Sequence, residues 1–185
     1  MLYDSKDLNL LKSLRSITSK IEDYDSDDGI DLYLTKAVRY FITALPTSLG
    51  RKNSMKISVP VDIFPVIHVL LNSNVFYWWW RVFGNGFQID SRDVSLFPLI
   101  PIPLEVAKKL SLELIAAESE CTVNKRNAGK DIPNVNYNFR QDILQKIDKT
   151  IFNSIGLKDH SRVFHSKSNS LFQKMDKLVG HGGRK

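Results

Sequence analysis

Basic and amide side chains, which contact phosphates and base edges in protein–DNA complexes, gather between positions 32 and 61 of the sequence. This window has five basic residues and no acidic residue. Lysine and arginine neutralise phosphates, and arginine and asparagine also offer donor and acceptor patterns that read base edges. The candidate contact residues in the window are Lys36, Arg39, Arg51, Lys52, Asn53 and Lys56. By composition alone, a DNA-contacting surface and a solvated basic face fit equally well.

Motifs of a catalytic centre are missing from the sequence. An aminomethyltransferase needs a glycine-rich turn after a strand and an Asn/Asp-Pro-Pro-aromatic loop, but Gly84 and Gly86 follow a predicted helix. A metal-dependent nuclease needs clustered carboxylates and a lysine, and Glu105 and Lys108 have the wrong spacing. The four histidines are too scattered for a metal site: His68, His160, His165 and His181. We expect no catalytic residue, metal or cofactor, with an enzyme of an unrecognised kind as an alternative.

The overall charge favours an anionic partner. The 185 residues carry a formal net charge of +6, and the pI is about 9.4. A single cysteine, Cys121, excludes an internal disulfide and is typical of a reducing cytosol. The N-terminal segment does not resemble a secretory signal, and polar residues interrupt the longest apolar run, residues 59–83. These features predict a soluble cytoplasmic protein without a membrane partner.

The stretch Tyr77 to Trp80, in which every residue is aromatic, is the most unusual of the chain. Their side chains would point in several directions from a helix. Base stacking and a membrane-interface belt are two functional interpretations. Packing inside the protein is favoured over both, because large aromatic side chains dominate burial.

Hydrophobic periodicity predicts helices alternating with short strands. Helices are expected over residues 1–21, 62–71, 75–83, 103–127 and 139–155, with a weaker one over 171–179. Strands are expected within 32–45, at 55–59 and at 87–89, with loops at 22–29, 46–54 and 127–137. Asp62 is predicted to cap one helix, and Ser73 or Asn74 the next. The segment Gly84 to Gly86 is predicted to end that helix with a left-handed residue.

These elements predict an α+β fold, with a small mixed sheet, packed helices and a long C-terminal spacer-like helix. The chain divides into three expected parts. They are an N-terminal helix with an acidic loop (1–31), a central domain (32–157) and a basic tail (158–185).

The central domain resembles a known family of DNA-modifying enzymes. The run VLLNSNVFYWWWRVF at residues 69–83 resembles a signature in the C-terminal recognition domains of adenine-specific methyltransferases, which occur in type IIG and related type II restriction-modification systems. Residues 84–99 are similar to the glycine turn, short strand and Phe-Pro step of that family. Residues 100–103, with the following helix, resemble type I specificity subunits, and residues 147–157 resemble the closing segment of type IIG chains.

The resemblance covers residues 32–157 and implies a non-catalytic target-recognition domain that binds double-stranded DNA beside a methyltransferase domain or subunit. In that family the catalytic residues lie upstream of this domain, so none is carried over. Arg81 and Arg92 join the basic window as DNA-contact candidates, and Asn72 and Ser73 are expected to be structural. An RNA-binding or protein-interaction module with the same basic surface is the alternative.

Overall fold

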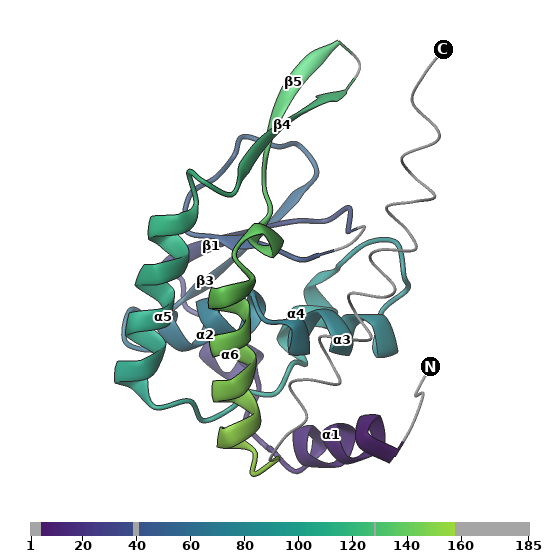
Figure 1. Cartoon of the computed structure of the whole chain (residues 1–185), viewed down its shortest axis with the longest axis vertical. Helices are drawn as coiled ribbons and strands as arrows, with labels where there is room; N and C mark the ends of the chain where they lie inside the picture. Colours follow the sequence, from purple (N-terminus) through teal and green to yellow (C-terminus); the bar gives the residue numbers. More distant parts are fainter. Residues whose placement is uncertain (1–4, 39–40, 128, 158–185) are drawn as a thin grey trace.

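Helices and two small antiparallel sheets make up the part of the chain that the structure describes (Figure 1). The computed structural model describes residues 5–38, 41–127 and 129–157. The predicted α+β fold is confirmed, but the prediction of a mixed sheet is wrong: in these ranges both sheets are antiparallel throughout. The predictions for Arg39, for the tail 158–185 and for a helix at 171–179 lie outside the described residues.

A three-stranded sheet forms from the basic window and the residues just before it. Its strands, in the order β2-β1-β3, are β1 (Ile30–Thr35), β2 (Ala44–Leu45) and β3 (Ser54–Val59). Alternate residues of β1 point to the same face. Leu32 and Leu34 are fully buried on the core face, whereas Tyr33 between them is only half-buried. Strands were predicted in this window, and the sheet confirms them.

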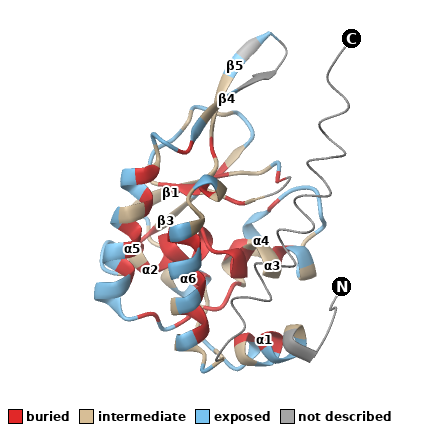
Figure 2. Cartoon of the chain, in the orientation of Figure 1, coloured by how far each residue is buried: buried red, intermediate tan, exposed pale blue. Residues whose placement is uncertain are grey.

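A central helix, α2 (Phe64–Leu71), connects the sheet to the other helices. It contacts strand β2 and the helices α3 (Asn74–Phe83), α5 (Leu104–Ala117) and α6 (Gln141–Ser154). Ile67, Leu70 and Leu71 are fully buried, as expected for a helix surrounded by other elements. Buried residues of α5 and α6 alternate with exposed ones along each helix, so each helix has an apolar face and a solvated face (Figure 2).

The remaining short helices pack at the edges of the same core. They are α1 (Ser5–Arg15), η1 (Ile21–Tyr24), α4 (Ser91–Ser95) and η2 (Tyr137–Phe139). Leu10 and Leu14 of α1 belong to the hydrophobic cluster that contains Leu32 of the sheet. The N-terminal helix ends at Arg15, earlier than predicted, and Ile21 is buried as the first residue of η1.

A two-stranded hairpin replaces the end of the predicted long helix and the polar loop after it. Its strands are β4 (Thr122–Asn127) and β5 (Lys130–Val135). The prediction of a helix to Asn127 is wrong beyond Ala117: the chain turns after that residue and is extended from Thr122, whose hydroxyl donates to the Glu118 carbonyl. Pro133 had favoured a loop, but a two-stranded ribbon has outer edges that tolerate a proline. The hairpin projects from the body of the molecule (Figure 1).

The helix ends also differ in detail from the predictions. Helix α2 begins after Ile63 instead of Asp62, whereas Ser73 caps α3 as predicted, accepting a hydrogen bond from the Phe76 N–H. The left-handed residue after α3 is Gly86, with φ of 79°, and Gly84 is extended. The strand predicted at 87–89 is reduced to a single bridge between residues 37 and 88. Among the described helices, none combines the length and the apolar character needed to cross a bilayer.

Candidate nucleic-acid interface

Arg51 fastens the basic window to the projecting hairpin. Its guanidinium donates hydrogen bonds to the Pro133 carbonyl, to Asn134 Oδ1 at 3.0 Å and to Thr35 Oγ1 at 3.3 Å. Partial burial lowers the pKa of Arg51, but an arginine remains charged at any physiological pH. Arg51 was predicted to contact DNA; in the structure its guanidinium bridges the sheet and the base of the hairpin.

Lys36, within the basic window, links the loop 50–53 to the turn that follows α3. Its backbone N–H donates to the Asn53 carbonyl at 3.1 Å, and its carbonyl accepts from the Ile89 N–H at 2.9 Å. Four segments are therefore contiguous: the hairpin, the loop 50–53, Lys36 and the turn 84–90. We call this arrangement the basic strip.

The other predicted contact residues are distributed along or beside this strip. Lys52 and Asn53 are exposed in the loop next to Arg51. Lys56, on β3, forms an ion pair with Asp31 at 3.2 Å. Desolvation acts to raise the pKa of Asp31, but hydrogen bonds from Lys56 and Tyr33 lower it overall. Part of the Lys56 charge is thus already compensated within the protein.

Arg81 and Arg92 flank the turn 84–90 in the sequence, and both are exposed. Arg81 lies in the last turn of α3, with its guanidinium carbon 6.0 Å from the centre of the Trp80 ring. Arg92 lies in α4. Both guanidinium groups are therefore accessible to solvent.

Sequence reasoning missed the hairpin and the exposed aromatic residue of the turn. Lys125 and Arg126 lie in β4, and Lys130 lies in β5. The glycine at position 129, with φ of 80°, was the local signal for the hairpin. Phe87 is 82% exposed, and its position after Gly86 could have indicated a loop tip.

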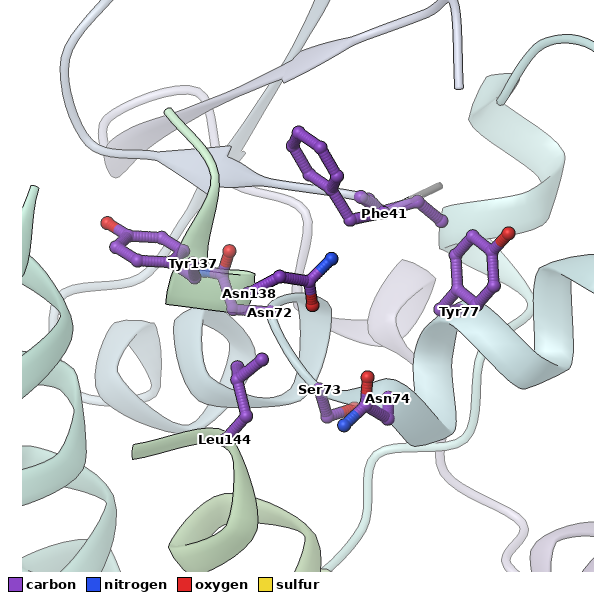
Figure 3. Close-up of a pocket in the computed structure, with 9 residues that line it drawn as sticks. Phe41, Asn72, Ser73, Asn74, Tyr77, Tyr137, Asn138 and Leu144 are labelled. Atoms are coloured by element: carbon purple, nitrogen blue, oxygen red, sulfur yellow. The ribbon is translucent and has the colours of Figure 1, made fainter. Parts of the chain in front are cut away.

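A polar hollow lies where the LLNSN part of the signature meets η2 and α6 (Figure 3). Asn72 binds Ala44 twice: its Oδ1 accepts from the Ala44 N–H at 3.0 Å, and its Nδ2 donates to the Ala44 carbonyl at 2.9 Å. The Asn72 Nδ2 also donates to the His68 carbonyl at 2.9 Å. Ser73 caps α3, as described above. These side chains hold β2, α2 and α3 together, in agreement with the structural role expected for Asn72 and Ser73.

Tyr137 forms another wall of this hollow, with its hydroxyl pointing away from Asn74 and Tyr77 (Figure 3). That hydroxyl is buried and has no hydrogen-bond partner within the described ranges. Burial raises the pKa of Tyr137. The tyrosine is therefore a neutral wall residue here, and the hollow has no arrangement of nucleophile and base.

Asp148 anchors the start of α3 to helix α6. Its two carboxylate oxygens accept hydrogen bonds from the Asn74 N–H at 3.1 Å and from the Asn74 Nδ2 at 2.8 Å. Burial raises the pKa of Asp148 to about 7, although the hydrogen bonds from Asn74 and Val75 act in the opposite direction. The carboxyl group lies at the N-terminus of α3, where the helix dipole favours a negative charge.

His68 is the second buried ionisable group of the helical core. Its Nδ1 lies 2.8 Å from the Ser111 hydroxyl of α5, and its ring stacks on Phe64 at 5.4 Å. Burial lowers the pKa of His68 to about 4, so the ring is neutral at physiological pH. Within the described ranges no three His, Cys, Asp or Glu side chains converge as a metal site would require. Two of the four histidines, His160 and His165, lie outside those ranges.

Comparison of the chain with family models, curated proteins and solved structures gives no match.

Proposed function

We propose that the chain is a non-catalytic recognition module that binds double-stranded DNA through the basic strip. The observation that supports it best is the projecting hairpin beside the basic loop, to which Arg51 joins it. The proposal of a methyltransferase domain or subunit as partner, within a restriction-modification system, is supported by the resemblance of residues 69–99. In this proposal the chain selects the DNA target and the partner modifies it.

The shape of the hairpin suits a duplex. Each of its strands has six residues, so the ribbon is about 20 Å long at roughly 3.3 Å per residue. The major groove of B-DNA is about 12 Å wide and about 8.5 Å deep, and it admits a two-stranded ribbon. A ribbon in the groove would bring the loop 50–53 against the adjacent phosphates. Lys52 and Asn53 are then the residues of the loop best placed to reach DNA, while Arg51 supports the ribbon.

The charges of the strip make the proposal testable by salt dependence. Fluorescence anisotropy with a labelled 30-base-pair duplex should show binding that weakens steeply with salt. Replacing two cations of the strip, Lys36→Gln with Lys52→Gln, should reduce the slope of log K against log salt by about two units, since each phosphate contact contributes about 0.9. The backbone bonds of Lys36 do not depend on its side chain, so the double variant keeps the fold.

A matched control removes the same charge elsewhere. Lys109→Gln with Lys149→Gln takes two exposed cations from α5 and α6, and the duplex slope should stay at the wild-type value. Equal losses in the two double variants would contradict the strip as the binding surface. Tighter binding of a 30-nucleotide single-stranded RNA than of the duplex would instead support the RNA-binding alternative.

A further inference from the structure

Phe87 exposes an aromatic ring to solvent almost completely. The side chain is 82% exposed, more than Phe83 at 42% and Phe139 at 59%. Phe83 packs against Trp79, with ring centres 4.3 Å apart and the ring planes tilted by 51°, and it lies under the guanidinium of Arg15. Among the described residues Phe87 gains no comparable burial, so packing within that part of the chain does not explain an aromatic residue at this position.

The backbone that carries Phe87 is held firmly. The Asn85 side-chain oxygen accepts from the N–H groups of both Phe87 and Gln88, at 2.8 and 2.9 Å. The Trp80 indole N–H donates to the Gln88 carbonyl at 3.2 Å. The turn is also bonded to the segment after β1, where the Val38 N–H donates to the Phe87 carbonyl at 3.4 Å. The ring therefore stands on a turn fixed to α3 and to the segment after β1.

The turn is also pressed against α3, which limits its movement. A Cβ atom at Gly84 would lie 2.6 Å from the Trp80 indole, so only glycine allows this close approach. Gly86 adopts φ of 79°, which L-residues rarely adopt. An exposed side chain on such a turn is pre-organised and loses little conformational freedom when it binds.

The groups around Phe87 indicate an anionic partner with flat apolar surfaces. Lys36 lies on the segment paired with the turn, and Arg81 and Arg92 flank it, all accessible at least in part. The two acids that follow the turn, Asp90 and Asp93, are engaged with each other's backbone N–H groups at 2.9 and 3.0 Å. Stacked bases bordered by phosphates match this combination of one ring and several cations.

We infer that Phe87 is a wedge that inserts its ring between two adjacent base pairs of the bound duplex, while the neighbouring cations hold the phosphates. Apolar wedges of this kind unstack one base step and kink the duplex. This inference rests on the proposed duplex binding. It adds a deformation of the DNA that phosphate contacts alone would not produce.

The test uses the full chain and 30-base-pair duplexes of the sequence that it enriches from a random duplex pool. The adenine analogue 2-aminopurine, placed at successive positions, brightens where stacking is lost. Wild-type protein should brighten one position several-fold. Phe87→Ala should abolish the brightening and weaken binding about tenfold, and Phe87→Leu should retain part of both. Phe139→Ala, which removes another exposed phenylalanine, should behave like the wild type.

The outcomes separate this inference from the proposed function. If the chain binds no duplex at any salt concentration, the proposed function fails and the wedge fails with it. If duplex binding is intact but no position brightens, or if Phe87→Ala brightens the same position as the wild type, the wedge is wrong and the proposed function stands. Thermal melting within about one degree of the wild type is expected for Phe87→Ala, because the ring is exposed.

Discussion

Asp148 and His68 are buried ionisable residues whose pKa values are shifted in opposite directions. The two shifts therefore change the free energy of unfolding with pH in opposite senses. The pKa of Asp148 is raised from 3.8 to about 7, so between pH 4 and 7 the folded state holds a proton that the unfolded state has lost. Its contribution to stability is complete at low pH and is lost as pH rises through 7. The pKa of His68 is lowered from 6.5 to about 4, so its contribution is complete above pH 6.5 and is lost as pH falls through 4.

The two contributions should nearly cancel between pH 4.5 and 6.5, at about 1.4 kcal/mol per pH unit each. Asp148→Asn should therefore reveal a rise in the free energy of unfolding with pH, relative to the wild type. His68→Gln should reveal a fall. Urea unfolding at pH 4.5, 5.5 and 6.5 measures both, and the double variant provides the control because it should regain the wild-type pH dependence. Identical pH dependence in the wild type and Asp148→Asn would contradict the proton on Asp148.

Trp80 should be the most costly of the three tryptophans to remove. It is fully buried, whereas Trp78 and Trp79 are only partly buried, and its indole N–H supports the turn at Gln88. Trp80→Ala should lower the free energy of unfolding by about 3–5 kcal/mol. Trp80→Phe should cost less, since it keeps most of the ring volume. Thermal and urea unfolding measure these losses, and an unchanged midpoint in Trp80→Ala would contradict the packing role.

At the scale of elements, Arg51 should control how firmly the hairpin is attached. Arg51→Ala removes the hydrogen bonds to the Pro133 carbonyl and Asn134. Amide hydrogen exchange in β4 and β5 should become faster, while exchange in β1 and β3 stays near the wild-type rate. Arg51→Lys, with a single ammonium group, should restore the protection only in part.

The same variants separate support of the hairpin from direct contact with DNA. If Arg51 only supports the hairpin, each variant should weaken duplex binding in proportion to its loss of exchange protection. The loss of binding should then be small for Arg51→Lys and larger for Arg51→Ala. A strong loss of binding with full protection of the hairpin would show that Arg51 itself contacts the DNA.

Elements with a strong local pattern could be predicted from the sequence. The β-branched and aromatic residues between Leu32 and Leu45 predicted strands there, and Ser73 or Asn74 predicted the start of α3. The hairpin was missed because apolar residues at helical spacing continue to Ala117 and Cys121, both buried, while Pro133 disfavours a strand. The competing signal was one glycine, at position 129, too short a pattern to outweigh them.

At the scale of the whole molecule, the sequence predicted several residues of the candidate site, but it did not predict how the folded chain brings them together. Lys36, Lys52 and Asn53 were identified by charge and residue type alone. Their connection to the hairpin depends on the hydrogen bonds from Arg51 to Pro133 and Asn134, which lie more than 80 positions later in the chain. The bond from Lys36 to Ile89 likewise joins distant segments. No local pattern encodes such contacts, because they form only when the complete core brings the segments together.

The Asn72 side chain also bears on whether two copies of the molecule can associate through the edge of the sheet. Strand β2 is an outer strand of its sheet, and such a strand offers unpaired backbone groups to which a foreign strand can add. At Ala44 both groups are already engaged by the Asn72 carboxamide, which is chemically equivalent to a peptide unit. Asn72 thus occupies the hydrogen-bonding position that one residue of an added strand would take. It protects this edge of the sheet from intermolecular strand addition while it holds α2 in place.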